Sequence, residues 1–408
     1  MPRRSGNMPP MVRTRSTTAV PLAASGGAEF PDPGRLVPLS PFDAFWVALP
    51  PVRRVFLFRS LPGVPFSDVV GTLRSSLAQW EGGSCGGFTF VEVETDLDFE
   101  RLVEEAAEHD QDALGQLVPD IRRDQLPAPV MAAQVTEFVG GGGGVALGVA
   151  VHHTAADGRG IWRFFEMWAA AAAGVEVDRV PAGSTPLHDR RLIGKSKFPI
   201  HVTDPALDAR RRLSRRTFTF AAPAVQRLKQ RLAFAANIGT APSTFAALAV
   251  HGWVSIARAS GFADDAPVFA AFLADCRAYM SPPAPDAYAG NCVALCMASL
   301  SGSELAGPDG PARALVAVRE AVAEAKRDPL RDLARWRTKF AVILAGSPWF
   351  PSYGVDFGFG RPARVELASM NHDGEVVLVA GREAGSVQAS VSIAAGKMQA
   401  FRDVFMAE

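Results

Sequence analysis

The chain has 408 residues, a length typical of two domains rather than one. Hydrophobic residues make up 48% and charged residues 21%, so the sequence can bury a large core. Lys and Arg number 42 together, as do Asp and Glu, and this balance argues against nucleic acid or an anionic membrane as a partner.

The four cysteines, Cys85, Cys276, Cys292 and Cys296, show no CxxC spacing, and a chain of this size needs no disulfide framework. We therefore expect a reduced, cytoplasmic setting. No apolar run approaches the roughly 20 residues of a membrane span. The first residues are basic but lack the apolar stretch of a secretory signal, and we expect a disordered tail over residues 1–11.

The first half predicts alternating strands and helices. β-Branched and alternating runs predict strands over residues 12–20, 52–59 and 88–94, the first of them at a sheet edge. A proline-bounded turn over residues 37–41 precedes a short apolar helix. Apolar residues at helical spacing predict longer helices over residues 66–80 and 98–108.

Two β-rich runs, residues 130–139 and 145–151, flank the five glycines Gly140 to Gly144. No Lys-Ser/Thr follows the glycines, so they indicate a hairpin tip rather than a phosphate-binding loop. The second run ends in His152 and His153. Asp157 then lies where a helix would begin, with Ile161, Phe164, Phe165 and Trp168 as its buried stripe.

A polar stretch from residue 181 to 216 links the two halves, and its arginines (Arg210–Arg212, Arg215, Arg216) are expected on a solvated linker face. Attraction of a polyphosphate ligand is the lesser alternative for them. The second half predicts strands at 217–220, 268–274, 364–370, 375–379 and 386–393, with helices at 224–234, from Ser243, at 308–333 and at 397–406. This alternation, without a dinucleotide fingerprint, favours a two-domain α/β fold.

His153 is the candidate for general-base chemistry, because a neutral imidazole can take a proton from an attacking hydroxyl. A single histidine after an apolar strand would ordinarily be a core residue. The pair His152-His153, followed by Asp157-Gly158 and by the downstream string Asp356 to Gly360, favours function instead. Asp157 is expected to order the loop, paired with an arginine. His188, His201 and His251 have no metal-ligand spacing, and no G-x-S-x-G elbow occurs.

The chain resembles the plant BAHD acyl-CoA-dependent acyltransferases. His153 to Gly158 matches the family's H-x-x-x-D-G motif, and Asp356 to Gly360 matches D-F-G-W-G with Phe359 in place of tryptophan. Leu39 to Trp46 is similar to L-T-F-F-D-x-x-W, and Asp275-Cys276-Arg277 with Pro282-Pro283 is similar to D-C-R-x-R-x-x-P-P. Tyr288 to Cys292 is similar to Y-F-G-N-C, which is typical of the branch that acylates anthocyanins and flavonoid or phenolic glucosides.

The resemblance implies an α/β, two-domain, chloramphenicol-acetyltransferase-like fold with a solvent channel between the domains. The domains would be 12–185, carrying HxxxD, and 216–408, carrying DFGFG, joined by a crossover linker at 186–215. His153 would be the base, and Asp157, Gly158, Arg277, Asp356, Gly358 and Gly360 would be structural residues at the site. Ser347 is the oxyanion candidate, and Ser243 and Thr244 are the CoA-binding candidates, although a helix cap explains them almost as well.

The sequence departs from the family pattern in three places. The string P-L-A-G-R, expected after the helix that ends near Trp80, is missing. Phe359 replaces the tryptophan of the second motif but keeps an aromatic ring. Trp349 stands where relatives often carry a basic residue, and a malonyl carboxylate would call for such a cation.

The leading interpretation is a monomeric O-acyltransferase with no permanently bound cofactor and no metal, which transfers a malonyl group from malonyl-CoA to a flavonoid, anthocyanin or phenolic glucoside. A second interpretation keeps the fold and uses a hydroxycinnamoyl or other acyl-CoA. A peptide-synthetase condensation domain shares the His-His-x-x-x-Asp-Gly pattern but would need carrier domains. A shortened, inactive homologue that binds ligand without turnover is the non-enzymatic alternative.

Overall fold

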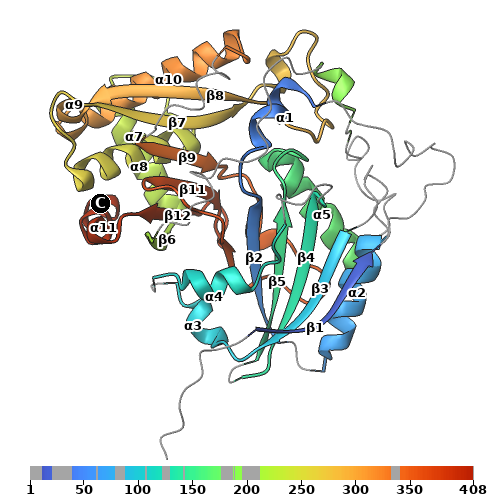
Figure 1. Ribbon diagram of the computed structural model, residues 1–408. Helices are drawn as coiled ribbons and strands as arrows, with labels where there is room; N and C mark the ends of the chain where they lie inside the picture. Colours follow the sequence, from blue (N-terminus) through green and yellow to red (C-terminus); the bar gives the residue numbers. More distant parts are fainter. Residues whose placement is uncertain are drawn as a thin grey trace, which may run out of the picture.

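The computed structural model describes residues 12–20, 39–60, 63–78, 88–105, 108–121, 129–140, 143–175, 187, 189–194, 212–331 and 341–407. Within these ranges, two six-stranded sheets form the framework, each with helices packed against it (Figure 1). The N-terminal half supplies most of one sheet and the C-terminal half supplies the other.

The first sheet has the order β1-β3-β4-β5-β2-β10. Its strands are β1 (Val12–Val20), β2 (Val52–Arg59), β3 (Phe88–Thr95), β4 (Met131–Phe138), β5 (Gly144–Val151) and β10 (Arg364–Leu367). Only β3 and β4 pair in parallel; the other neighbours in this sheet are antiparallel. Every residue of β5 is buried, because this strand lies inside the sheet and is covered on both faces.

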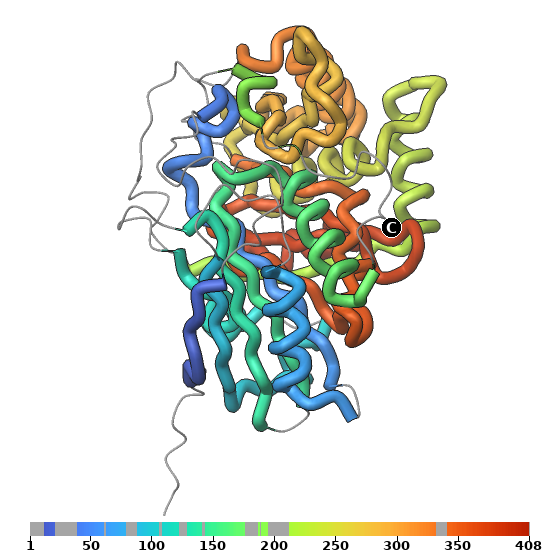
Figure 2. The backbone as a smooth tube through the Cα atoms, turned by 90° about the vertical axis from the view of Figure 1, so that its right-hand side faces the viewer, coloured from blue at the N-terminus to red at the C-terminus, as the bar shows by residue number. Residues whose placement is uncertain are grey.

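Helices cover both faces of the first sheet. On one face lie α2 (Phe66–Ala78) and α5 (Gly158–Ala172), which are visible side by side in Figure 2. The Trp168 indole N–H of α5 donates to Leu73 O and Ser76 Oγ of α2, which fixes the two helices against each other. The short helices α3 (Phe99–Val103) and α4 (Gln111–Gln116) help to cover the opposite face.

The second sheet has the order β6-β12-β11-β9-β7-β8. Its strands are β6 (Ser214–Phe220), β7 (Pro267–Asp275), β8 (Val293–Ser301), β9 (Val342–Gly346), β11 (Glu375–Ala380) and β12 (Val387–Ile393). Five α-helices of this half lie within the described residues: α7 (Ala222–Ala235), α8 (Thr244–Ser260), α9 (Gly302–Ala306), α10 (Gly310–Arg327) and α11 (Met398–Phe405). They share one apolar core with the sheet, and α8 lies at its centre with Trp253 fully buried.

One strand crosses between the halves. β10 belongs to the C-terminal half of the sequence but pairs antiparallel with β2, so that Arg364 lies opposite Leu57. Its Glu366 is buried and accepts hydrogen bonds from Arg364 and from Thr217 of β6. Strand pairing and a buried polar cluster therefore tie the two halves together.

Most predicted elements are confirmed, two of them to the residue. The strands expected at 12–20 and 52–59 are β1 and β2, and the helix expected from Ser243 is α8 with Ser243 as its N-cap. The helix expected over 98–108 is wrong: α3 ends at Val103, and α4 follows from Gln111 after a new cap at Asp110. The local sequence pattern predicted neither β8 nor β9.

The expected linker needs a correction at its end. Ser214 and Arg215 lie in β6, opposite Ile393 and Ser392 of β12, and Arg215 is only 4% exposed. The solvated face expected for the linker arginines is therefore wrong for Arg215. Other expectations fall outside the described residues: the tail over 1–11, the shortened segment after Trp80, and most of the linker.

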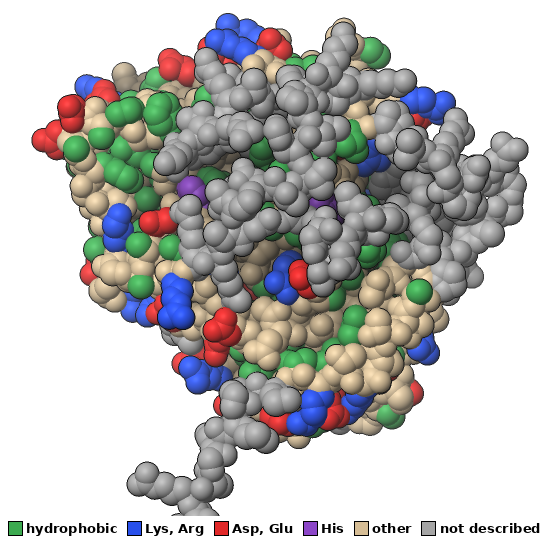
Figure 3. Space-filling view, in the orientation of Figure 1, with side chains coloured by type: hydrophobic (Ala, Val, Ile, Leu, Met, Phe, Trp, Pro, Cys, Tyr) green, Lys and Arg blue, Asp and Glu red, His purple; other side chains and the backbone are tan. Residues whose placement is uncertain are grey.

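Among the described residues, no helix is both long enough and apolar enough to cross a membrane. On the face drawn in Figure 3, basic and acidic side chains are interspersed, in keeping with the equal numbers of the two kinds in the sequence.

Candidate active site

His153 lies in the turn that joins β5 to α5. β5 ends at Val151, and the turn is closed by the Ala155 N–H, which donates to His152 O at 2.9 Å. Asp157 then caps α5, because its Oδ1 accepts from the Gly160 N–H at 3.0 Å. The strand end and the helix cap hold the intervening turn from both sides.

The tryptophan ring of Trp46 covers one face of the His153 imidazole. The two ring centroids lie 3.5 Å apart and the planes differ by 7°. Trp46 is the last residue of α1 (Pro41–Trp46), a single turn that begins with a capping box between Ser40 and Asp43. This short helix therefore has a defined start, which fixes the position of the indole.

The Asn291 amide contacts the His153 imidazole, and the Asp43 carboxylate contacts that amide. Asn291 Oδ1 is 3.3 Å from His153 Nδ1, and Asn291 Nδ2 donates to His153 O at 2.8 Å. The same Nδ2 donates to Asp43 Oδ1 at 2.8 Å. Asp43 is fully buried and also accepts from the Ser40 N–H at 2.8 Å and from Arg190 Nε at 2.9 Å.

Asp157 and Arg277 form a buried ion pair that joins the two halves beside His153. Arg277 Nη2 donates to Asp157 Oδ2 at 2.8 Å, and the Cys292 N–H donates to the same oxygen at 3.1 Å. Burial raises the pKa of Asp157, and the Arg277 charge and two backbone N–H groups oppose that rise. Burial alone would lower the pKa of Arg277, but attraction to Asp157 and Asp275 leaves it raised. Because the Asp157 oxygens accept three N–H groups and donate none, the pair is ionised.

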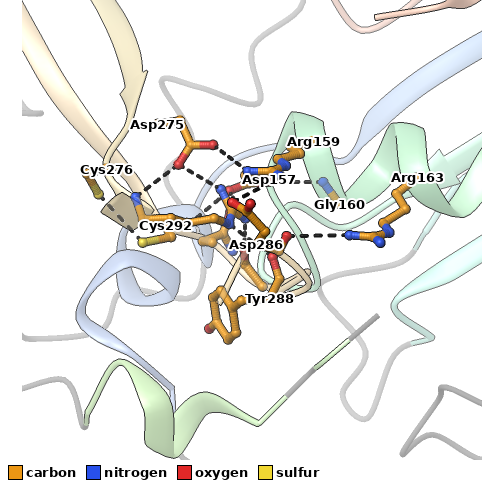
Figure 4. A network of polar contacts seen from close by, with 12 residues as sticks. Asp157, Arg159, Gly160, Arg163, Asp275, Cys276, Asp286, Tyr288 and Cys292 are labelled. Carbon is orange, nitrogen blue, oxygen red and sulfur yellow. Dashed lines mark hydrogen bonds and ion pairs between the residues drawn. The ribbon is translucent and has the colours of Figure 1, made fainter. Parts of the chain in front are cut away.

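Further polar contacts surround this ion pair (Figure 4). Asp275, at the end of β7, contacts Arg277 at 3.1 Å and Arg159 of α5 at 3.2 Å. Cys276 and Cys292 lie with their sulfur atoms 3.6 Å apart, both buried. Figure 4 shows these groups converging from β7, from the loop before β8 and from the start of α5. Asp157 and Arg277, which were expected to pair, are in direct contact in the structure. Gly158, the first residue of α5, follows Asp157.

The imidazole of His153 is neutral at ordinary pH. Burial lowers its pKa from 6.5 to about 4, against smaller opposing contributions from hydrogen bonds to its own carbonyl and to Asn291. A neutral imidazole has a free lone pair and can accept a proton from a hydroxyl group.

The second motif lies at the other end of α5. Asp356 Oδ1 accepts from the Gly358 and Gly360 N–H groups, both at 2.9 Å, and both glycines have positive φ, at 92° and 94°. A Cβ on Gly358 would lie 3.4 Å from Ala172 O, at the C-terminus of α5. Since α5 has 15 residues, this turn is about 20 Å from the His153 turn. Asp356 is therefore a turn-closing residue that does not reach the imidazole.

Aromatic rings connect the second motif to α5. Phe357 packs edge-on against Trp168 at 5.1 Å, and Phe359 packs against Phe58 of β2 at 5.0 Å. Phe359, which stands where relatives carry tryptophan, thus fills a buried position with an aromatic ring.

The loop after β9 carries Ser347 and Trp349 towards the start of α5. Its Phe350 stacks on Trp162 at 6.0 Å, and a Cβ on Gly158 would lie 2.9 Å from the Phe350 ring, so a side chain there would have to displace that ring. Ser347 Oγ accepts from the Trp349 N–H at 3.2 Å, and its own hydroxyl hydrogen has no acceptor among the described residues. Trp349 is 84% exposed.

Ser243 lies in a surface groove of about 370 Å³ between the start of α8 and one face of α10. Ser243 Oγ accepts from the Ala246 N–H at 3.1 Å, as a helix cap does. Two cations from α10, Arg319 and Lys326, line the same groove. Lys326 Nζ is 4.9 Å from the ring of Tyr279, two residues after Arg277. Thr244 is half-buried and does not line the groove.

Several residues around His153 were not assigned a role from the sequence. Trp46, Asp43 and Asn291 were noted only as parts of motifs, and Arg190, Arg319 and Lys326 were not singled out. The motifs themselves were the available signal, because Asp43 with Trp46 and Asn291 with Cys292 stand in two of the quoted strings.

Comparison with known proteins gives concordant matches. Residues 81–407 match the sequence profile of a family described as the transferase family. The chain is 32% identical over 339 residues to putrescine hydroxycinnamoyltransferase 1 of Oryza sativa subsp. japonica, covering 73% of this chain and 76% of the relative. It is 24% identical over 439 residues to phenolic glucoside malonyltransferase 1 of Arabidopsis thaliana, covering 90% and 92%.

Crystal structures with the same fold are also found. Vinorine synthase superposes with a TM-score of 0.73 at 15% identity, covering 96% of both chains. F. graminearum TRI101, in complex with coenzyme A and T-2 mycotoxin, superposes with a TM-score of 0.63 at 16% identity, covering 89% of this chain and 96% of that one. These matches confirm the chloramphenicol-acetyltransferase-like fold expected from the sequence.

Proposed function

The chain belongs to the BAHD acyl-CoA-dependent acyltransferases, and we propose that it transfers a malonyl group from malonyl-CoA to a hydroxyl of a flavonoid, anthocyanin or phenolic glucoside. The observation that carries the proposal is the position of His153 in the β5–α5 turn, stacked on Trp46 and beside the Asp157–Arg277 ion pair that joins the two halves. Burial lowers the pKa of this imidazole to about 4.

His153 is the general base of this reaction. Its ring nitrogen takes the proton of the acceptor hydroxyl as the oxygen attacks the thioester carbonyl. A tetrahedral oxyanion forms, the carbon–sulfur bond breaks, and CoA leaves as a thiol with the proton returned by the imidazolium. Ser347 is the proposed donor to the oxyanion, which is supported by its uncommitted hydroxyl hydrogen in the loop beside Gly158.

The donor nucleotide is proposed to bind in the groove beside Ser243. Backbone N–H groups at the start of a long helix attract phosphate, and Arg319 and Lys326 add two positive charges to the same groove. Thr244, the first residue of α8, does not line the groove, and its side chain is given no contact with the donor in this proposal. Lys326 lies on Tyr279 near Arg277, which supports a path for the pantetheine arm towards the site. This path would follow the proposed channel between the domains.

A hydroxycinnamoyl-CoA is the alternative donor, and the comparison with relatives supports it. The relative at 32% identity is a hydroxycinnamoyltransferase, whereas the malonyltransferases match at 24% to 25% over more of the chain. A hydroxycinnamoyl donor also dispenses with the cation that a malonyl carboxylate requires, and Trp349 stands at the position where relatives often carry one. The proposed substrates are therefore ranked as malonyl-CoA first and a hydroxycinnamoyl-CoA second.

The proposal is tested by measuring CoA release and product mass with the purified full chain. Malonyl-CoA and a hydroxycinnamoyl-CoA are each paired with a phenolic glucoside, an unglycosylated phenol and putrescine. Malonyl transfer to the glucoside supports the leading proposal. Faster turnover with the hydroxycinnamoyl donor would assign hydroxycinnamoyl-CoA as the donor in place of malonyl-CoA. Acylation of putrescine would assign an amine as the acceptor in place of the glucoside. CoA binding without release from either donor with any acceptor supports an inactive homologue.

The cellular location, oligomeric state and domain boundaries of the protein are also proposed. We propose a cytoplasmic monomer with domains at 12–185 and 214–408 and a linker at 186–213, because β6 of the second sheet begins at Ser214. β10 is the strand of the second domain that pairs with the first sheet. Gel filtration at micromolar concentration tests the monomer, and a fluorescent fusion tests the location.

A further inference from the structure

We propose that Asn291, held by Asp43, is a positioning residue that fixes His153 in the tautomer with the proton on Nδ1 and the lone pair on Nε2. The inference rests on the proposed role of His153 as the base. It adds a residue pair, from two segments about 250 positions apart in the sequence, that decides which imidazole nitrogen faces the substrate.

The orientation of the Asn291 amide follows from its neighbours. One end of the amide faces Asp43 Oδ1 and His153 O, each at 2.8 Å. A carboxylate and a carbonyl oxygen can only accept, so this end must be the NH₂ group with its two donors. The other end, which faces the imidazole, is therefore the amide oxygen.

The tautomer of His153 follows from the amide. Asn291 Oδ1 is 3.3 Å from Nδ1 and has no hydrogen to donate. A neutral imidazole carries one N–H, and an Nδ1 lone pair would face the lone pairs of the amide oxygen. The contact is favourable only when Nδ1 carries the proton, which leaves Nε2 as the proton acceptor.

Asp43 keeps Asn291 in this orientation. Its carboxylate accepts from Asn291 Nδ2, the Ser40 N–H and Arg190 Nε, at 2.8, 2.8 and 2.9 Å. An amide at position 43 has one acceptor atom and one donor group, and could not accept all three. Since Asp43 is fully buried, no water can replace the missing acceptor at low cost.

The neighbouring histidine provides an internal comparison. The Thr154 backbone N–H, which can only donate, points at His152 Nδ1 at 3.3 Å, and Thr154 Oγ1 is 2.8 Å from the same atom. His152 Nδ1 therefore carries a lone pair, and the proton of the neutral ring is on Nε2. Adjacent histidines in one turn are thus expected to hold opposite tautomers.

The first test reads the tautomer directly in the resting protein. Nitrogen-15 NMR of histidine-labelled full chain distinguishes protonated from unprotonated ring nitrogens, and His152→Gln and His153→Gln assign the two signals. We expect His153 protonated at Nδ1 and His152 at Nε2. In Asn291→Ala, His153 is expected to populate both tautomers while His152 is unchanged. Nε2–H at His153 in the unmodified protein, or an unchanged tautomer in Asn291→Ala, would overturn the inference.

The second test follows turnover. Asn291→Ala is expected to lower kcat by at least about tenfold, within the 10²- to 10⁴-fold that a general base contributes, while KM for the acyl donor changes less than threefold. The kcat of Asp43→Asn is expected to lie between the kcat of Asn291→Ala and that of the unmodified protein. An unchanged kcat in folded Asn291→Ala would contradict the positioning role.

Gln388 supplies a matched control. It is a buried amide of β12 whose Nε2 donates to Val365 O and whose Oε1 accepts from the Tyr353 hydroxyl, away from the His153 turn. Gln388→Ala removes a comparable buried amide and is expected to lower the melting temperature without altering the His153 tautomer. The outcome is separable from the proposed function, because the tautomer is measured without substrate, whereas activity retained in His153→Ala would refute only the base assignment.

Discussion

The Trp46 indole lies parallel to the His153 imidazole, with 3.5 Å between the ring centroids and 7° between the planes. One ring comes from a one-turn helix near the N-terminus and the other from the turn after β5. The stack closes one face of the imidazole, while Asn291 contacts its Nδ1 edge. Trp46 against one face and Asn291 against one edge therefore restrict rotation of the imidazole. The Nε2 edge remains available to the substrate.

Replacing Trp46 tests this restriction. Trp46→Ala removes a ring that is 7% exposed and is expected to cost about 3 to 5 kcal/mol of stability, with kcat reduced at least about tenfold because the imidazole can rotate. Trp46→Phe keeps an aromatic face and should recover most of kcat. Stopped assays at a temperature where both variants are folded separate the two effects. Equal kcat in Trp46→Ala and the unmodified protein would show that the stack does not orient His153.

The two motif aspartates should differ sharply in stability. Asp157→Ala leaves the buried Arg277 without its closest carboxylate and is expected to cost about 3 to 5 kcal/mol. Asp356→Ala removes two hydrogen bonds from an exposed turn and is expected to cost about 1 to 3 kcal/mol. Melting temperatures measured by circular dichroism compare the two. A larger loss for Asp356→Ala would contradict the greater contribution to stability assigned to the buried Asp157–Arg277 pair.

The pH dependence of kcat/KM should show the lowered pKa of His153. Only the neutral imidazole accepts a proton, so the rate falls as the pH drops through its pKa, which burial lowers from 6.5 to about 4. We expect the acid limb near pH 4. The pH profile is measured with malonyl-CoA and with an uncharged acyl donor. An acid limb that is present with both donors is due to the protein and not to protonation of the malonyl carboxylate. An acid limb near pH 6.5 with both donors would contradict the burial of the ring.

Removing the groove cations should weaken donor binding without affecting chemistry. Arg319→Ala and Lys326→Ala are each expected to raise KM for acyl-CoA by about tenfold, since a charge-assisted hydrogen bond to phosphate is worth about 1.5 kcal/mol or more. kcat should stay within about twofold. Arg327→Ala, an exposed arginine of the same helix outside the groove lining, is the matched control. An equal change in all three variants would indicate general electrostatics instead of a specific site.

The strands were the most predictable part of the fold. β1 and β2 match their predicted bounds because β-branched and aromatic residues alternate there between clear turn residues. β8 was missed because Val293–Ser301 contains two alanines, a cysteine and a methionine, which do not distinguish a buried strand from a helix. The pairing of β10 with β2 could not be predicted from local pattern, since the two strands are about 300 residues apart.

For the site, the sequence identified His153, Asp157 and Arg277 from motif strings, and the structure brings them together. Asn291 and Asp43 stood in quoted motifs without a role. The contacts from Asp43 to Asn291 and from Asn291 to His153 join three segments that meet only in the folded chain, and no spacing rule relates positions 43, 153 and 291. The groove cations Arg319 and Lys326 were missed because charged residues on a helix face are ordinarily solvated.

The most direct test of the central claim compares CoA release by the unmodified protein and by His153→Ala, with the donor and acceptor that give the fastest turnover. Both proteins are first shown to be folded by circular dichroism and to bind CoA equally. We predict that His153→Ala lowers the rate of CoA release by about 10²-fold or more at unchanged donor affinity. A rate within twofold of the unmodified protein would contradict the assignment of His153 as the general base.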